Sequence, residues 1–310
     1  MPGIAREEQG SAGGWFDRLV ARVQGEERKT IAVAMAQEGH VLQALEAARK
    51  HNLANGILVG EIEAIRRAAE EVEVDLSHFE LVPQRGEEEA VHRAIEVVRA
   101  KEAELLMKGK CSTAAFLRGI LDREKGLRGS GLLSHLAVFE VSTYPKPLFM
   151  SDAAMNICPD LLQKVEITKN AIWAAHRLGV EVPKVALIAA AERVDPEHMP
   201  CTVDAAAIAK MADRGQLGKA LVDGPLAVDN ALDPESCRVK GIQSAVAGDA
   251  DILIMPNIEA GNTFYKVMTI LARAKTAGVL LGARVPVVLP SRADSDETKF
   301  LSIAVAVALS

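Results

Sequence analysis

The residues best suited to chemistry lie near the carboxyl end of the chain, where the apolar run 285–289 stops at Pro290. Ser291, Arg292 and Asp294 follow, so a hydroxyl, a guanidinium and a carboxylate enter one polar loop. In open α/β sheets ligands bind beyond the carboxyl ends of the strands, which makes this loop a candidate reaction site. No Gly-x-Ser-x-Gly pattern surrounds Ser291, so its predicted role is hydrogen bonding and not nucleophilic attack.

A second candidate follows the apolar run 103–107, where a segment with helical periodicity begins. Lys108 is followed by Ser112 and Thr113, and Arg118 stands five to six residues beyond the two hydroxyls. A helix amino terminus presents unpaired N–H groups and a positive dipole end, which favour an anion such as phosphate. An ordinary helix cap with solvated lysines explains the motif equally well when it is taken alone.

Polar segments also follow other apolar runs. Asp152 and Asn156 come after one run, and Asn257, Gly261 and Asn262 come after another. Capping and turn formation explain each residue individually. Gly261 either lets the backbone approach a ligand closely or serves a tight turn. The shared position of these residues after strands predicts that they line a cleft.

The elements that position these residues are predicted from the alternation of apolar runs with helical segments. This βαβ pattern indicates an α/β fold with mostly parallel strands and crossover helices. Strands are expected at 31–36, 56–60, 79–82, 103–107, 135–141, 147–150, 185–191, 219–222, 252–255, 279–281 and 285–289. A closing helix is expected over residues 298–309.

The length of 310 residues favours two α/β domains over one. Pro145 and Pro147 mark the expected boundary, because two prolines so close together break regular structure. We predict a leader over residues 1–29, a first domain from 30–145 with 285–310, and a second domain from 146–284.

The composition excludes several classes of protein. Hydrophobic residues make up 49% and charged residues 25%, as in soluble globular proteins, and the net charge of -6 argues against nucleic-acid binding. The absence of a long apolar run and of a signal-like amino terminus predicts a cytoplasmic protein. Neither the four cysteines nor the seven histidines show metal-ligand spacing, so no metal is expected. The glycine-rich fingerprints of dinucleotide and nucleoside-triphosphate sites are also missing.

Taken together, the motifs resemble the phosphate acetyltransferase/phosphate butyryltransferase family, and they are most similar to its butyryl branch. The resemblance runs from about residue 30 to the end of the sequence. Its motifs are MKG (107–109), LSH (133–135), VFE (138–140), SDAAMN (151–156), DAAA (204–207), KMADRGQ (210–216), DGPLAVDN (223–230), GDADIL (248–253), PNIEAGN (256–262) and SRADS (291–295).

The resemblance implies two α/β domains that face each other across a cleft, related in fold to the isocitrate and isopropylmalate dehydrogenases. It further implies a homodimer, the usual state, or a higher homo-oligomer. It also implies the reaction of acyl-CoA with phosphate to give acyl phosphate and CoA, by direct transfer in a ternary complex. A short acyl chain is expected, with a butyryl-like group preferred. Acyl-CoA and CoA are then substrates, and no cofactor is expected.

Within this resemblance, Ser112, Thr113 and Arg118 match the family's phosphate-binding segment, and Lys108 precedes them. Ser291 and Arg292 match its Ser-Arg pair. Ser291 would then hydrogen-bond the reacting carbonyl, and Arg292 would bind CoA or phosphate through charge-assisted bonds.

The general base stays open at this point. The acetyl enzymes have an aspartate seven residues after the serine, where this sequence has Thr298. Asp294 or Asp296 is the substitute that the residues offer, and a reaction without a protein base is the other alternative. Two alternative functions also remain: a non-catalytic acyl-CoA or metabolite-sensing domain of the same family, and a phosphate acetyltransferase acting on acetyl-CoA.

Overall fold

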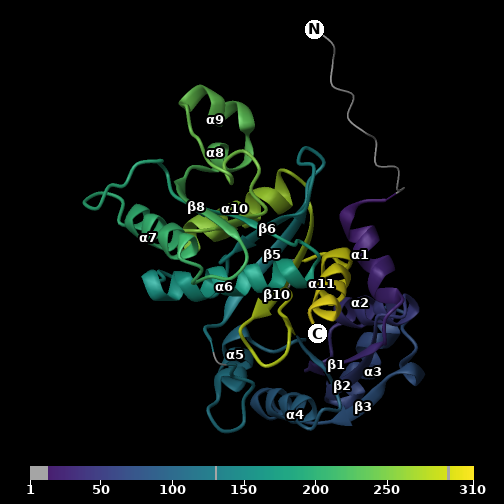
Figure 1. Cartoon of the computed structure of the whole chain (residues 1–310). Coiled ribbons are helices and arrows are strands. Elements are labelled where there is room, and N and C mark those ends of the chain that lie inside the picture. The colour runs from purple at the N-terminus through teal and green to yellow at the C-terminus, as the bar shows by residue number, and fades with distance from the viewer. Residues whose placement is uncertain (1–12, 130, 292–293) are drawn as a thin grey trace.

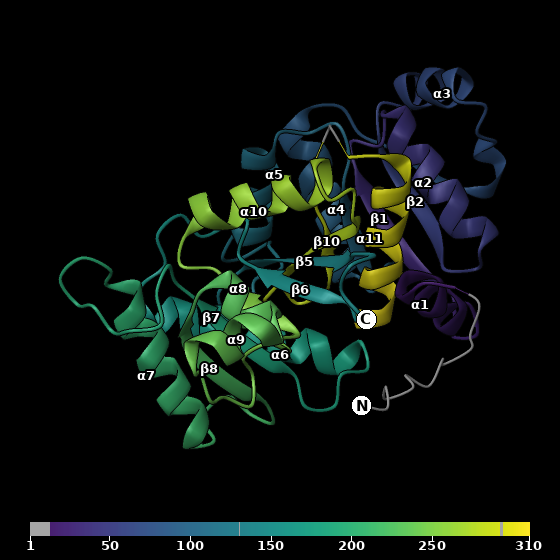
Figure 2. The same ribbon diagram turned by 90° about the horizontal axis from the view of Figure 1, so that it is seen from above.

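The computed structural model describes residues 13–129, 131–291 and 294–310. They form an α/β fold in which helices pack on one mixed β-sheet that runs through the whole molecule (Figure 1, Figure 2). No helix within these three ranges has both the length and the apolar character needed to cross a membrane.

The amino-terminal part follows the βαβ pattern that the sequence predicts. Its parallel strands have the Val-, Ile- and Leu-rich composition of strands buried on both faces. Its elements are β1 (Lys29–Ala34), α2 (Gly39–Lys50), β2 (Ala54–Gly60), α3 (Ile62–Glu71), the short 3-10 helix η1 (Leu76–His78), β3 (Glu80–Pro83), α4 (Glu87–Arg99), β4 (Leu105–Lys108) and α5 (Thr113–Leu121).

The following part begins with two antiparallel strands and then returns to parallel pairing. Its elements are β5 (Ser134–Glu140), β6 (Leu148–Ser151), α6 (Leu161–Arg177), β7 (Lys184–Ile188), α7 (Cys201–Asp213), β8 (Leu221–Leu226), α8 (Val228–Leu232), α9 (Pro234–Lys240), β9 (Ile252–Ile254) and α10 (Ile258–Ile270).

The last strands complete the centre of the sheet. They are β10 (Lys275–Leu281) and β11 (Val287–Val288), and α11 (Asp296–Leu309) follows them. The strand order is β3-β2-β1-β4-β11-β10-β5-β6-β9-β7-β8, so β10 and β11 join the two parts. β10 is antiparallel to both of its neighbours, whereas β11 is parallel to β4. The strand β10 falls within the predicted second domain and pairs with strands of the predicted first domain. The division into two domains stays a prediction.

Alternate residues of each central strand face opposite sides of the sheet, as the pleat requires. On β1, Ile31 and Val33 belong to one apolar cluster, together with residues of α2, α6 and α11. Ala32 and Ala34 belong to another cluster with residues of α4 and α5. A third cluster lies under α8 and α10. The core therefore has layers on both faces of the sheet.

The segment predicted as a leader contains a helix, α1 (Trp15–Gln24). Its side chains Phe16, Leu19 and Val23 are buried in the main apolar cluster. The Phe16 N–H donates to the Glu140 carboxylate at 2.8 Å, which ties this helix to the end of β5. From Trp15 onward the segment is thus packed against the sheet.

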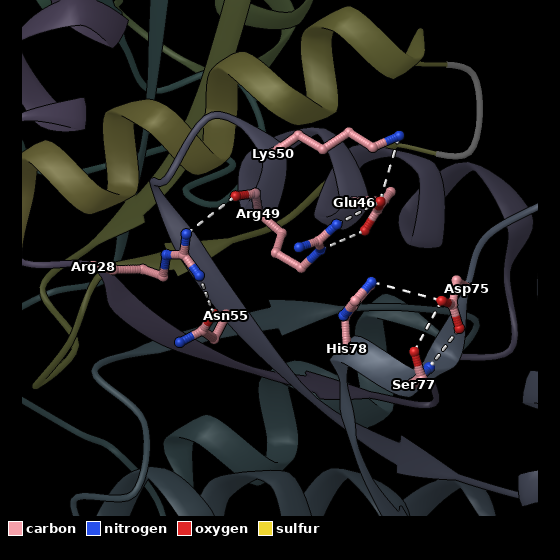
Figure 3. Close-up of polar contacts among 8 residues, drawn as sticks. All are labelled: Arg28, Glu46, Arg49, Lys50, Asn55, Asp75, Ser77 and His78. Carbon is pink, nitrogen blue, oxygen red and sulfur yellow. Dashed lines mark hydrogen bonds and ion pairs between the residues drawn. The ribbon is translucent and has the colours of Figure 1, made fainter.

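Ionic and polar contacts form within and between α2, the start of β1, β2 and η1 in the amino-terminal part (Figure 3). Both ends of the Arg49 guanidinium donate to Glu46, and this hydrogen bond lowers the pKa of the Glu46 carboxyl. Arg28 donates to Asn55 at 3.0 Å, which connects the start of β1 to β2. Asp75 accepts hydrogen bonds from the N–H and hydroxyl of Ser77 and so caps η1.

Candidate active site

A cavity of about 240 Å³ lies at the end of β11, where the Ser291 loop meets α5 and α10. It brings together Thr113, Asn262, Ser291 and Asp294, four predicted site residues from three separate segments. The described residues that line it are Thr113, His135, Ala153, Ala154, Asn262, Tyr265, Lys266, Leu289, Pro290, Ser291 and Asp294. This is the edge of the sheet where ligands of α/β proteins bind.

Two further hollows help to locate the site. One of about 350 Å³ shares Tyr265, Lys266 and Asp294 with the cavity and adds Arg273 and Lys275. A larger, mainly apolar hollow of about 530 Å³ is lined by Pro286, which precedes β11, and so lies at the opposite end of that strand. None of the predicted site residues that the structure describes lines this larger hollow.

Two hydrogen bonds join Ser291 and Asp294, which both line the cavity. The Ser291 N–H donates to Asp294 Oδ2 at 2.7 Å, and the Asp294 N–H donates to the Ser291 carbonyl at 3.1 Å. Arg292 lies outside the described residues. Asp296, the other carboxylate left open by the sequence, begins α11 and accepts a hydrogen bond from His40 at 2.8 Å. Of the two carboxylates, Asp294 lines the cavity.

The start of α5 is capped from within the protein. Ser112 is the N-cap, and its hydroxyl accepts the Ala115 N–H at 3.2 Å. The Ser112 N–H donates to the carboxylate of Glu87, and this hydrogen bond lowers the pKa of Glu87. A carboxylate therefore already binds a backbone N–H at the predicted anion site. Thr113, the first residue of the helix, is exposed and faces the cavity.

The two predicted phosphate-binding cations do not line the cavity. Lys108 is buried, and its ammonium donates to the Gly109 carbonyl at 3.0 Å. Arg118 does not fold back toward Ser112: its guanidinium is exposed and donates to Glu88 of α4 at 2.8 Å.

Asp152 and Asn156 organise one wall of the cavity. Asp152 is buried, and its Oδ1 accepts the N–H groups of Ala154 and Met155 at 2.8 and 3.0 Å. Its Oδ2 accepts the Asn156 amide at 2.6 Å, and that amide also donates to the Leu133 carbonyl at 2.9 Å. These bonds fix the bend that presents Ala153 and Ala154 to the cavity.

The opposite wall is the first part of α10. Asn257 is its N-cap and accepts the Ala260 N–H at 3.0 Å. Gly261 lets α10 approach the Asp152 backbone closely, since a Cβ there would lie 2.2 Å from the Asp152 carbonyl oxygen. Its φ is outside the left-handed region, so no turn requires a glycine at this position. Asn262 lines the cavity and donates to the Ala153 carbonyl at 3.2 Å.

His135, Tyr265 and Lys266 line the cavity and were not predicted as site residues from the sequence. The His135 side chain is 7% exposed, its Nδ1 has no hydrogen-bond partner in the described part of the chain, and burial lowers its pKa, so the imidazole is neutral. The Tyr265 ring packs edge-on against it with centroids 6.0 Å apart. Burial also raises the pKa of the Tyr265 phenol. The Lys266 ammonium lies 5.4 Å from the centre of the Tyr265 ring.

A signal for two of these residues was present in the sequence. Tyr265 and Lys266 stand four residues after Gly261 and Asn262, a spacing that puts them on the same face of a helix. His135 lies inside a strand, where no spacing rule marks it.

Across the described ranges, no group of three or more His, Cys, Asp or Glu side chains is arranged to hold a metal ion. The expectation that the protein needs no metal and no cofactor stays a prediction.

Comparison with protein families agrees with this geometry. The model of the Phosphate acetyl/butaryl transferase family matches residues 15–93 and 87–307. The chain belongs to this family. The motifs that suggested it include those that build the cavity walls, at 151–156, 256–262 and 291–295.

Individual relatives are similar over nearly their whole length. The phosphate butyryltransferase of Clostridium acetobutylicum is 45% identical over 94% of this chain and 96% of its own length. The phosphate acetyltransferase of Thermotoga maritima is 43% identical over 94% of this chain and 98% of its own. A solved branched-chain phosphotransacylase from Enterococcus faecalis has a TM-score of 0.81 and 33% identity, and the match covers 91% of this chain and 98% of that one.

A dehydrogenase shares the fold more distantly. The 4-hydroxythreonine-4-phosphate dehydrogenase of Klebsiella pneumoniae has a TM-score of 0.55 and 11% identity over 91% of this chain and 99% of its own, which is a likeness of fold alone. The expected relation to isocitrate and isopropylmalate dehydrogenases stays a prediction.

Proposed function

We propose that the protein is a phosphate acyltransferase, which converts a short-chain acyl-CoA and phosphate into acyl phosphate and CoA, with a butyryl-like group preferred. One observation carries the proposal: in a member of this family, one cavity brings Ser291 and Asp294 to the amino terminus of α5. A hydroxyl donor thus faces a helix amino terminus that already binds one anion, the Glu87 carboxylate, which phosphate replaces in the proposed reaction.

Each residue has a defined part in this reaction. The Ser291 hydroxyl hydrogen-bonds the reacting carbonyl and stabilises the oxyanion that develops on it. Thr113 and the start of α5 hold the phosphate, with Lys108 and Ser112 behind them. Arg118 joins the phosphate by leaving Glu88, an exchange that costs little because an exposed ion pair contributes only about 0–1 kcal/mol. Arg292 is assigned to CoA or phosphate.

Asp294 is the proposed general base, which accepts the proton of the CoA thiol when the reaction runs toward acyl-CoA. Its carboxylate lines the cavity, whereas Asp296 is held by His40. An Asp294→Asn protein with full turnover would remove this assignment.

The two adjoining hollows offer room for both substrates. The 240 Å³ cavity is assigned to the acyl and phosphoryl groups, and the neighbouring 350 Å³ hollow to part of CoA. Lys266 and Arg273 in that hollow carry positive charge suited to CoA phosphates. Lys275 joins them by giving up its exposed pairs with Asp17 and Glu297, at 3.8 and 4.0 Å. Asp152, Asn156, Asn257, Gly261 and Asn262 are assigned to the walls between the two substrates.

A phosphate acetyltransferase is the second candidate, and the 43% identity to the Thermotoga maritima enzyme supports it. Discrimination amounts to about 1–3 kcal/mol per methylene, and butyryl has two more than acetyl, so a cavity that takes butyryl takes acetyl with an efficiency lower by about 2–6 kcal/mol. The family's non-catalytic sensing role is disfavoured, because the hydroxyls of Ser112, Thr113 and Ser291 are all retained.

We also propose that the protein acts in the cytoplasm as a homodimer. The prediction from sequence is the support for both statements. Light scattering on the eluting protein gives its mass in solution, and a monomer at working concentration would contradict the dimer.

The decisive experiment measures thiol release from acetyl-, propionyl-, butyryl- and isobutyryl-CoA with and without phosphate. The expected result is release that requires phosphate, is fastest with a four-carbon chain, and falls in Ser291→Ala and Arg118→Ala variants. Folded protein that binds CoA but turns over none of the four substrates would refute the proposal and favour the sensing role.

A further inference from the structure

A buried lysine of α11 contacts the backbone of Asp294, which is hydrogen-bonded to Ser291. Lys299 is 0% exposed, and its ammonium donates to the Asp294 carbonyl at 2.5 Å. No carboxylate of the described residues lies within 4 Å of this ammonium. Lys164, another buried lysine, is different, because its ammonium pairs with Asp204 at 2.7 Å.

Stability of the fold does not explain Lys299. A buried ammonium without a counter-ion costs several kcal/mol in lost hydration. A cation in the first turn of a helix also opposes the helix dipole, and Lys299 is the fourth residue of α11. The long side chain loses rotamer freedom as well. A methionine of similar length would avoid the first two of these costs and leave the Asp294 carbonyl to water.

The location of Lys299 points to the cavity. It stands five residues after Asp294, and its side chain reaches back from the core to the Asp294 carbonyl, while two other hydrogen bonds join Asp294 to Ser291. On the α5 side, Lys108 is also buried, donates to a loop carbonyl and has no described carboxylate within 4 Å. Lys108 is nevertheless close enough to Glu87 to lower the pKa of that carboxyl. Lys299 is therefore the clearer case: a buried ammonium with no described carboxylate within 4 Å, bonded to the backbone of a residue that lines a cavity assigned to anionic substrates.

We propose that Lys299 is a positioning residue that holds Asp294, and through it Ser291, against the cavity, and that its charge, which has no described carboxylate within 4 Å, favours the anion bound there. The inference rests on the proposed function for the identity of that anion, which is phosphate or the phosphoryl group of an acyl phosphate. The ammonium acts through the Asp294 carbonyl and through its field, without touching the substrate.

The test compares Lys299→Met and Lys299→Arg with the wild-type protein, and uses Lys164→Met as the control for removal of a buried lysine. Two quantities are measured: kcat and KM in the thiol-release assay, and the rise in Tm that inorganic phosphate produces. We expect Lys299→Met to unfold at no lower temperature than the wild type, to lose about 100-fold in kcat, the order that misplacement by 1 Å produces, and to lose the phosphate-induced rise. Its KM for acyl-CoA should change less than kcat.

The other variants separate charge and position from packing. Lys299→Arg should recover part of the lost kcat, because it keeps both charge and donor. Lys164→Met should unfold at a lower temperature, since Asp204 loses its partner, and should keep the wild-type kcat and phosphate response. If Lys299→Met does not fold, Lys299→Gln replaces it.

The outcomes distinguish this inference from the proposed function. A neutral Lys299 variant with wild-type kcat and an unchanged phosphate response would overturn the role of Lys299 and leave the function intact. Wild-type protein without phosphate-dependent thiol release would refute the function. In that case the Tm measurement decides. The inference is supported if phosphate raises the Tm of the wild type but not that of Lys299→Met. It is overturned if phosphate raises the Tm of Lys299→Met as well, or does not raise that of the wild type.

Discussion

Replacement of Gly261 by alanine tests how closely α10 approaches the opposite wall of the site. Gly261 is the fourth residue of α10, and an added Cβ would lie 2.2 Å from the Asp152 carbonyl oxygen and 3.2 Å from Ala153 Cα. Both atoms belong to the backbone and cannot turn aside as a flexible side chain would. The helix must therefore move away from the Asp152 segment, and the cavity between them must widen.

The magnitude follows from two opposing effects. Overpacking of a tight contact costs typically 1–3 kcal/mol, and contact with backbone places this site near about 3 kcal/mol. Alanine in a helix interior gains about 1 kcal/mol over glycine. The free energy of unfolding should therefore fall by about 2 kcal/mol, and kcat should fall as well because Asn262, Tyr265 and Lys266 move with the helix.

Urea denaturation of Gly261→Ala and Gly25→Ala measures this effect. Gly25 follows α1 with an ordinary negative φ, and a Cβ there would lie 3.5 Å from the Arg22 carbonyl oxygen, a normal contact. We expect Gly25→Ala to unfold within about 0.5 kcal/mol of wild type or to be slightly more stable. A Gly261→Ala protein stabilised by about 1 kcal/mol, as helix propensity alone predicts, would refute the proposed contact.

Three further predictions concern burial and charge. Burial lowers the pKa of His135, so below about pH 6.5 the unfolded state binds a proton that the folded state does not. The free energy of unfolding should therefore decrease as the pH falls, by up to about 1.4 kcal/mol per pH unit. Urea midpoints measured between pH 7 and 5 should depend less on pH in His135→Phe than in the wild type, and an equal pH dependence would contradict this prediction. Asp204→Ala leaves the Lys164 ammonium buried without its partner and should cost about 3 kcal/mol by denaturant unfolding; a loss below 1 kcal/mol would show that water reaches the lysine. Burial raises the pKa of the Cys111 thiol to about 11. At pH 8 a disulfide reagent should therefore modify the exposed Cys158 in native protein and reach Cys111 only after unfolding. Mass spectrometry of the labelled peptides measures both modifications, and labelled Cys111 from native protein would contradict the prediction.

Much of the fold follows from local patterns in the sequence. Apolar runs predicted the position of every central strand, because a strand buried on both faces must be apolar throughout. The apolar runs do not indicate which strands pair with each other in the sheet. β10 and β11 occupy the centre of the sheet, and β10 runs antiparallel to its neighbours, because residues far apart in the chain meet there.

In the site, too, some residues were predictable from the neighbouring sequence, whereas others depend on contacts between segments far apart in the chain. Ser291, Asp294 and Thr113 were predictable because polar residues directly after strands gather at one edge of a parallel sheet. The ion pair of Arg118 with Glu88 was not, since it depends on how α4 and α5 pack together. Lys299 was hidden for a similar reason: a lysine in the first turn of a predicted helix gives no sign that the fold will bury it.

The order of strands in the sheet bears on how the protein is made. β11 lies between β4 and β10, so the two parts of the sheet stay unjoined until the ribosome has synthesised residues 287–288. Synthesis proceeds at about 5–20 residues per second, so the free edge of β4 waits for seconds before its neighbour exists. An unpaired apolar edge invites pairing with other chains. The nascent polypeptide is therefore most vulnerable to aggregation in that interval, and chaperones that bind unpaired strands would act on it then.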